Sequence, residues 1–171
     1  MTGMKSLRCP NCGTPFVRVT LQEGAVERLL SRFNMLPFRC QLCTNRFRAF
    51  SPGTRPNTQA FDRREFKRLS ASIDAQVLDE RQSAFVNRIT DISMAGCTLV
   101  GTGLAKGAFV ELVLKPTSED DEIRIETAMV CSVHPESVGL RFLEVDQIDK
   151  QRLSQVVLGL LVSQTNPMMN V

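Results

Sequence analysis

Two closely spaced cysteine pairs constrain the fold of this chain more than any other feature. They are Cys9-Pro-Asn-Cys12 and Cys40-Gln-Leu-Cys43, separated by 27 residues. Each pair forms a tight knuckle with two thiolates, and four thiolates complete a tetrahedral, closed Zn²⁺ site. We therefore predict a structural zinc ion in a small N-terminal zinc ribbon, which needs the metal because so short a segment buries little apolar surface. Redox-active thiols or unliganded free cysteines are the alternatives.

Charge is divided unevenly along the 171-residue chain. Residues 1–68 carry 13 Lys and Arg against 4 Asp and Glu, a net charge of +9, whereas residues 69–171 carry 8 against 14, a net charge of −6. The basic part predicts a polyanionic or phosphorylated partner. No apolar run is long enough to span a membrane, and the N-terminus lacks an apolar signal segment, so we expect a cytoplasmic protein.

The hydrophobic pattern predicts a mainly β protein. Early in the chain, residues 16–19 and 46–50 alternate like strands, and residues 23–33 have apolar side chains at helical spacing. Six further strands are expected at 71–78, 83–92, 97–101, 109–114, 123–133 and 138–142, followed by a helix at about 146–163. These six strands predict a barrel or a sandwich. The expected division is a zinc ribbon at 1–50, a Pro/Gly/Asn/Thr-rich linker at 51–60 and a β domain at 61–171.

A second group of residues lies just before the first of the six expected strands and around the end of the second. They are Arg63, Arg64, Arg68, Asp91, Ser93 and Gly96. Arg can bond a guanine edge with two N–H groups, stack on the base or bridge phosphates, and Asp91 and Ser93 leave the same face of a strand. Gly96 permits a tight turn or a positive φ. The alternative is a solvated basic linker and two turn-capping side chains.

The spacing Arg64-x-x-x-Arg68 followed by Asp91-x-Ser93-x-x-Gly96 resembles the signature of the PilZ domain, whose members bind the bacterial second messenger cyclic di-GMP. The resemblance runs from about residue 61 to residue 161. It implies a six-stranded antiparallel β-barrel with a C-terminal helix, and a ligand site made of the six residues just named. The same resemblance implies that an Arg at position 63 accompanies an intercalated pair of ligands. The text CPNCG and PFRCQLCTNRF resembles a bacterial zinc ribbon.

We therefore expect a non-enzymatic cyclic di-GMP receptor, in which the ligand orders the Arg-rich linker and the zinc ribbon contacts an unidentified protein partner. The alternative is a zinc-ribbon nucleic-acid-binding protein with a degenerate or regulatory barrel; a structural adaptor without a ligand is a third possibility. In the nucleic-acid alternative, ribbon side chains would bind bases and phosphates. These are Phe16, Phe38, Phe47, Phe50, Arg18, Arg39, Arg46 and Arg48. In the other interpretation, the Phe side chains cover the zinc knuckles and the Arg side chains offset the negative charge of the four-cysteine site. We expect structural roles for Cys97, Cys131 and His134.

Overall fold

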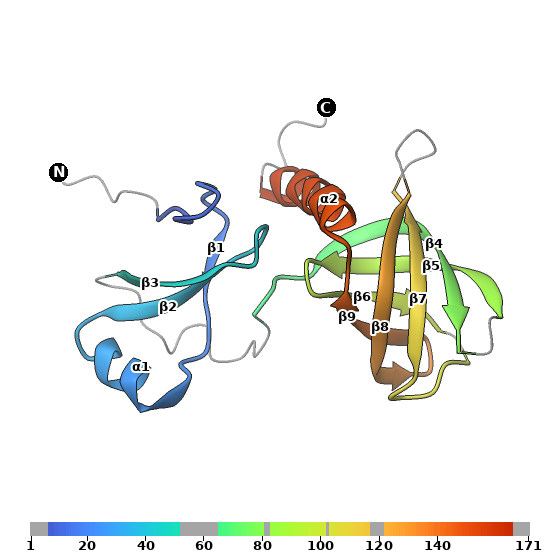
Figure 1. The fold of residues 1–171 in the computed structure, drawn as a ribbon, viewed down its shortest axis with the longest axis horizontal. Coiled ribbons are helices and arrows are strands. Elements are labelled where there is room, and N and C mark those ends of the chain that lie inside the picture. The colour runs from blue at the N-terminus through green and yellow to red at the C-terminus, as the bar shows by residue number, and fades with distance from the viewer. Residues whose placement is uncertain (1–6, 52–64, 81–82, 102, 117–121, 166–171) are drawn as a thin grey trace. The chain divides into compact units, whose positions relative to one another are not determined.

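The computed structural model describes residues 7–51, 65–80, 83–101, 103–116 and 122–165. It divides into two compact units, Met1–Lys67, called here the ribbon unit, and Arg68–Val171, called the barrel unit (Figure 1). Most of the predicted linker at 51–60, together with Arg63 and Arg64, lies outside the described residues. The residues between Arg64 and Arg68 belong to the ribbon unit, although the motif that contains them leads into the barrel.

The ribbon unit contains a three-stranded antiparallel sheet in the order β1-β2-β3. The strands are β1 (Val17–Val19), β2 (Met35–Cys40) and β3 (Arg46–Phe50), and helix α1 (Gly24–Ser31) connects β1 to β2. The sequence predicted β1, α1 and β3 but not the central strand, because Pro37 lies within it. Pro37 falls just beyond the stretch of β2 that pairs with β1, and its carbonyl accepts a hydrogen bond from the Thr20 amide.

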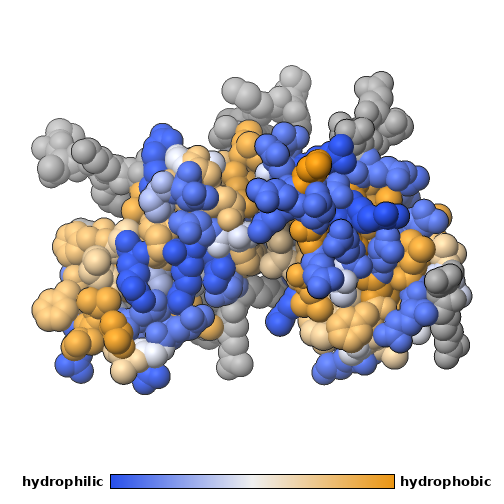
Figure 2. Space-filling model, viewed as in Figure 1, coloured by the Kyte–Doolittle hydropathy of each residue, from blue (hydrophilic) through white to orange (hydrophobic). Residues whose placement is uncertain are grey.

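Helix α1 turns a charged side chain inward and apolar side chains outward. Glu27 is 3% exposed, whereas Val26 and Leu29 are 64% and 58% exposed, and Phe33, just beyond the helix, is 67% exposed. Figure 2 shows hydrophobic residues gathered over this part of the surface. The helical spacing of the apolar residues correctly predicted a helix, but the face that contacts the sheet is the one that carries Glu27.

The barrel unit is a closed antiparallel barrel in the order β4-β5-β6-β9-β8-β7 (Figure 1). Its strands are β4 (Leu69–Asp79), β5 (Ala84–Ser93), β6 (Gly96–Val100), β7 (Phe109–Lys115), β8 (Ile123–His134) and β9 (Ser137–Glu144). All six correspond to predicted strands, so the six-stranded antiparallel barrel is confirmed. Alternate residues fill the interior, as the period of two requires.

Helix α2 (Gln147–Thr165) packs against β4 and β8. Its buried side chains are Leu153, Val157 and Leu161, which recur every four residues on one face. Ile148, in the first turn of the helix, is 62% exposed. Among the described residues, no helix is long and apolar enough to cross a membrane.

Candidate functional site

Three strands of the barrel bring three outward-facing residues into one row. Asp91 on β5 is opposite Thr98 on β6, and Thr98 is opposite Gly139 on β9. Their neighbours Ile92 and Leu140 are buried in the barrel, and side chains alternate between the two faces of a strand. The row therefore lies on the outer surface of the barrel.

Arg68 lies across this row immediately before β4. Its Nη1 donates to Asp91 Oδ1 at 2.9 Å and also to Thr98 Oγ1, while Thr98 Oγ1 donates to Asp91 Oδ1 at 3.1 Å. The side chains of Arg68 and Asp91 are each 28% exposed. A Cβ on Gly139 would lie 2.4 Å from Ser132 Oγ and 4.0 Å from Arg68 Nη2, so the missing side chain lets these groups approach the strand. The guanidinium is thus fixed in place while part of it stays open to solvent.

Ser93 and Gly96 bracket the turn between β5 and β6. Ser93 is 5% exposed; its hydroxyl donates to the Gly96 carbonyl at 3.2 Å and accepts from the Ala95 amide at 3.3 Å. Gly96 has no positive φ. A Cβ there would lie 2.1 Å from the Leu140 carbonyl oxygen, so glycine is required by the close approach of β9. The positive φ considered for Gly96 is absent, and the close contact with β9 is a requirement that the sequence analysis did not include.

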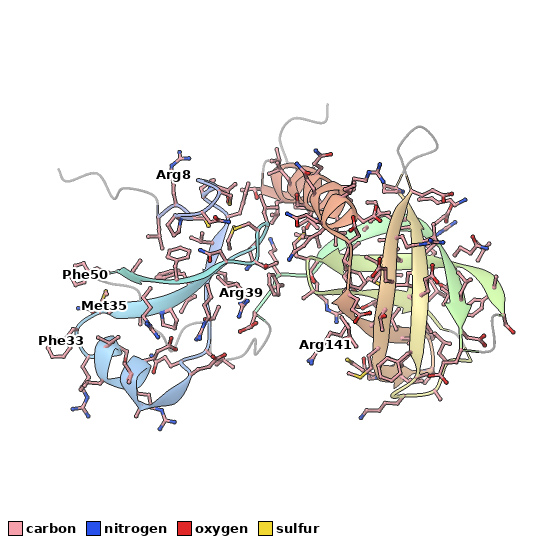
Figure 3. All side chains as sticks on the ribbon, in the orientation of Figure 1. Arg8, Phe33, Met35, Arg39, Phe50 and Arg141 are labelled. Carbon is pink, nitrogen blue, oxygen red and sulfur yellow. The ribbon has the colours of Figure 1, made fainter. Side chains whose placement is uncertain are left out.

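Of the six predicted ligand-site residues, four are described: the structure joins Arg68 to Asp91 and Ser93 to Gly96, whereas Arg63 and Arg64 lie outside the described residues. Sequence reasoning missed Thr98, whose only signal is its register opposite Asp91. It also passed over Arg141, an exposed residue opposite Gly96 on β9. Figure 3 shows Arg141 projecting from the barrel surface. A second cation therefore lies beside the row that Arg68 crosses.

In the ribbon unit, the four cysteines of the two pairs converge. The Sγ atoms of Cys9, Cys12, Cys40 and Cys43 all lie within 4.8 Å of one another. The Cys9–Cys43 and Cys12–Cys40 Sγ distances are both 3.5 Å, close to the roughly 3.8 Å edge of a tetrahedron with Zn–S bonds of about 2.3 Å. The Leu42 amide donates to Cys40 Sγ at 3.5 Å, as expected in a metal knuckle. This group can hold a metal ion.

The thiols of this cluster differ in acidity. Burial raises the pKa of Cys43 to about 12. Burial also acts to raise the pKa of Cys12, but hydrogen bonds with Thr14 and with neighbouring thiols outweigh it and lower this pKa to about 6. Because only thiolates bind metal, and crowded thiolates need a cation to offset their charge, the cluster is suited to a divalent ion.

Arginines of the ribbon sheet pair with carboxylates. Arg46 Nη2 and Arg48 Nη2 lie 2.8 Å and 3.1 Å from the Glu27 carboxylate oxygens. The Glu23 amide donates to Glu27, and this bond together with the two guanidinium groups holds the Glu27 pKa below its ordinary value despite burial. Arg46 and Arg48 therefore balance a buried carboxylate, a role that neither sequence interpretation included.

Four other residues considered in the sequence analysis differ in their burial and contacts. Phe38 is 6% exposed and stacks on Phe47, with ring centroids 5.9 Å apart. Cys97 is fully buried in the barrel, where burial raises its thiol pKa, and Cys131 is half-buried. His134 is exposed at the end of β8. The packing of Phe38 and Cys97 agrees with the structural roles considered for them.

The sequence matches the family model of the PilZ domain over residues 62–159. The chain belongs to the PilZ domain family. No curated protein is significantly similar to it in sequence. The PilZ match begins within the segment that precedes β4 and includes the Arg68–Asp91–Thr98 group, so this group is part of the family domain.

Solved structures share the PilZ fold with this chain. The structure described as the PilZ domain with c-di-GMP of YcgR from Escherichia coli has a TM-score of 0.54 at 16% identity, covering 64% of this chain and 100% of that one. The K. pneumonia MrkH–c-di-GMP complex has a TM-score of 0.53 at 21% identity, and the match covers 62% of this chain and 55% of that one. The complex of YcgR with c-di-GMP from Escherichia coli has a TM-score of 0.53 at 16% identity, and the match covers 90% of this chain and 78% of that one.

Proposed function

We propose that this PilZ protein is a cytoplasmic, non-enzymatic receptor for cyclic di-GMP. The observation that carries the proposal is the Arg68–Asp91–Thr98 group on the outer face of the barrel, within the residues that match the family. The similar YcgR and MrkH structures are described as complexes with c-di-GMP, which supports the same ligand here. In the proposal, Arg63, Arg64, Arg68, Asp91, Ser93 and Gly96 form the site.

The chemistry of the group suits a guanine nucleotide. Guanine presents O6 and N7 as acceptors to a guanidinium, and its N1–H and amino group are donors to a carboxylate. Arg68 supplies the guanidinium and Asp91 the carboxylate, and Arg68 Nη1 lies 2.9 Å from Asp91 Oδ1. Arg141 adds a cation for a phosphate, while Ser93 and Gly96 maintain the turn at the edge of the site.

Signalling in this proposal depends on the chain that joins the two units. A ligand held by Arg63 and Arg64 on one side and by Asp91 on the other would fix the conformation of residues just before β4. The ribbon unit, stabilised by zinc at its four cysteines, would then be presented in one orientation to a protein partner. Hydrogen exchange of the amides of residues 61–64 with and without ligand tests this step, since unchanged exchange of these amides contradicts it.

The nucleic-acid alternative has less support from the described residues. It requires ribbon guanidinium groups directed at phosphates, whereas Arg39, Arg46 and Arg48 each pair with a carboxylate of the ribbon unit. The carboxylates of Glu27 and Glu65 offset part of this positive charge, which reduces the attraction of the ribbon arginines for phosphates. A sequence-selective, submicromolar complex with nucleic acid at physiological salt would nevertheless favour this alternative over the receptor.

Titration calorimetry with cyclic di-GMP tests the proposed function. We expect Arg64→Ala and Arg68→Ala each to weaken binding by roughly ten- to a hundredfold, because each change removes charge-assisted hydrogen bonds worth about 1.5–3 kcal/mol. Arg124→Ala is the matched control, since Arg124 is an exposed barrel arginine that pairs with Glu111. Binding of undiminished strength by the Arg64→Ala, Arg68→Ala double variant would contradict the assigned site.

A further inference from the structure

The second cysteine knuckle holds the residues that lie between the two motif arginines. The Gln41 carboxamide, directly after Cys40, donates from Nε2 to the Glu65 carbonyl at 3.0 Å and accepts from the Lys67 amide at 2.7 Å. Gln41 is only 6% exposed. Its side chain therefore bonds the backbone of this segment much as a neighbouring strand would, with one donor and one acceptor.

The residue on the other side of Cys40 binds the same segment. Arg39 Nε lies 3.1 Å from Glu65 Oε2, and Arg39 Nη2 donates to Glu65 Oε1 at 3.3 Å. The Arg39 guanidinium also lies over the Phe66 ring, 5.6 Å from its centroid. Its Nη1 donates to the Thr44 carbonyl at 3.1 Å, which ties it to the knuckle loop. Residues 65–67 are thus bonded to the knuckle from both flanks of one metal-ligand cysteine.

We propose that Gln41 is a positioning residue for the ligand site: it fixes the backbone between Arg64 and Arg68, so that the ordered, metal-loaded knuckle raises the affinity for cyclic di-GMP. This inference rests on the proposed function. It adds to that function a thermodynamic coupling between the metal site and the nucleotide site, carried by Gln41 and supported by Arg39.

The physical basis is the order of the knuckle. Cys40 is fully buried, its Sγ accepts from the Leu42 amide, and Gln41 lies between these two residues. A metal site of four thiolates and its surrounding loop form together, so loss of the ion releases the loop. The ligand must then order residues 65–67 itself, which lowers its affinity. By reciprocity, the ligand strengthens zinc binding by the same factor.

The test is a cycle of four titrations with cyclic di-GMP on the full chain: wild type and Gln41→Ala, each zinc-loaded and zinc-depleted under reducing conditions. We expect depletion to weaken binding to wild type about tenfold, a typical coupling between sites. Zinc-loaded Gln41→Ala should already show most of this loss, and because only the Arg39 contacts remain, depletion should then weaken binding less than it does in wild type. Equal effects of depletion in both proteins, or wild-type affinity of zinc-loaded Gln41→Ala, would overturn the coupling.

Two controls separate positioning from damage to the ribbon. Gln22→Ala makes the same change at a half-buried glutamine that precedes α1 and has no described bond to residues 65–67, and it should bind the ligand as wild type does. Gln41→Glu retains an acceptor for the Lys67 amide but loses the donor to Glu65, and it should also weaken binding. Both Gln41 variants should retain one zinc ion per chain; if they do not, the weaker binding reflects a damaged knuckle and the positioning role is wrong.

An amide-exchange measurement tests the coupling without the nucleotide. The Lys67 amide, which donates to Gln41, should exchange slowly in zinc-loaded wild type and rapidly after zinc depletion or in Gln41→Ala. Exchange that does not depend on Gln41 would overturn this inference alone. Failure of zinc-loaded wild type to bind cyclic di-GMP would instead overturn the proposed function, and this inference with it.

Discussion

Glu27 is a buried carboxylate on the inner face of α1, matched by Arg46 and Arg48 of β3. The bond from the Glu23 amide and the two guanidinium groups keep its pKa in the folded state below the unfolded value of about 4.3. A carboxyl group with a lowered folded-state pKa contributes stability above the unfolded value and loses that contribution as the pH falls through the folded value. Its contribution is therefore complete at neutral pH.

Replacing this charge should destabilise the ribbon unit. We expect Glu27→Gln to lower the free energy of unfolding by about 1–3 kcal/mol, because two arginines lose a carboxylate that is only 3% exposed. The difference should be constant between pH 6 and 8, where Glu27 stays ionised. Thermal unfolding of the zinc-loaded protein measures both effects. Glu23→Gln, whose side chain is 66% exposed, should cost less, and equal losses would contradict this account.

At the scale of elements, the pairing of β6 with β9 depends on Gly96. A Cβ at this position would approach the Leu140 carbonyl oxygen to 2.1 Å, so the two strands would have to separate. We expect Gly96→Ala to destabilise the barrel unit by about 1–3 kcal/mol in chemical denaturation. Gly159→Ala in α2 is the matched control: its added methyl meets no atom within 4 Å, and it should stabilise by about 0.5–1 kcal/mol. Equal free energies of unfolding for the two variants would contradict this account, because β9 would then move to accommodate the added methyl group without loss of stability.

The elements of the barrel were predictable because their pattern is local. Interior residues such as Ile73, Ala75 and Val77 recur at every second position, and turns separate the strands. In the ribbon, the sequence did not predict β2. This strand contains Pro37, and a proline in a short run argues against a central strand. The orientation of α1 depends on Glu27 meeting two arginines from β3, a tertiary contact that helical spacing does not encode.

The candidate site likewise contains residues that the sequence predicted and residues that it did not. The resemblance to the PilZ signature led to Arg68 and Asp91, which the structure places 2.9 Å apart. Thr98 and Arg141 carry no signature of their own, because a threonine or an arginine on an exposed strand face is common. Only the strand order β5-β6-β9 places them beside the motif residues. Their position beside the motif residues is a consequence of the strand order.

At the scale of the whole molecule, the two units differ in what stabilises them. Among the described residues, only Leu36 of the twelve largest fully buried side chains belongs to the ribbon unit, and the other eleven belong to the barrel unit. We therefore expect a unit with so small an apolar core to depend on a metal ion at its four cysteines. The barrel, in contrast, has a core of its own.

Removal of zinc should therefore unfold one unit and leave the other folded. We expect a chelator, added under reducing conditions, to abolish the dispersed amide signals of residues 7–51 while those of the barrel strands persist. The matched control is Cys131→Ser, which changes a half-buried cysteine outside the cluster and should leave one zinc ion bound. Protein purified under reducing conditions without bound zinc, or a ribbon that stays folded after chelation, would contradict the structural role of the metal.

The stoichiometry of ligand binding depends on how many cations the site supplies. Two stacked cyclic di-GMP molecules bring four phosphates and four guanines to one surface, and Arg68 already shares its Nη1 with Asp91 and Thr98. Arg63 would add a guanidinium that offsets phosphate charge and stacks on an outer guanine. We therefore expect two ligands per wild-type chain in calorimetry, and one ligand in Arg63→Leu.

Arg88→Leu is the control for this change, because Arg88 is an exposed barrel arginine paired with Asp74, and it should retain two ligands. Loss of the second ligand in both variants would mean that general positive charge, and not position 63, determines the stoichiometry. One ligand in wild type, unchanged in Arg63→Leu, would contradict the paired arrangement. That result would still agree with a receptor whose single ligand is held by Arg64, Arg68 and Asp91, since these contacts do not require a second molecule.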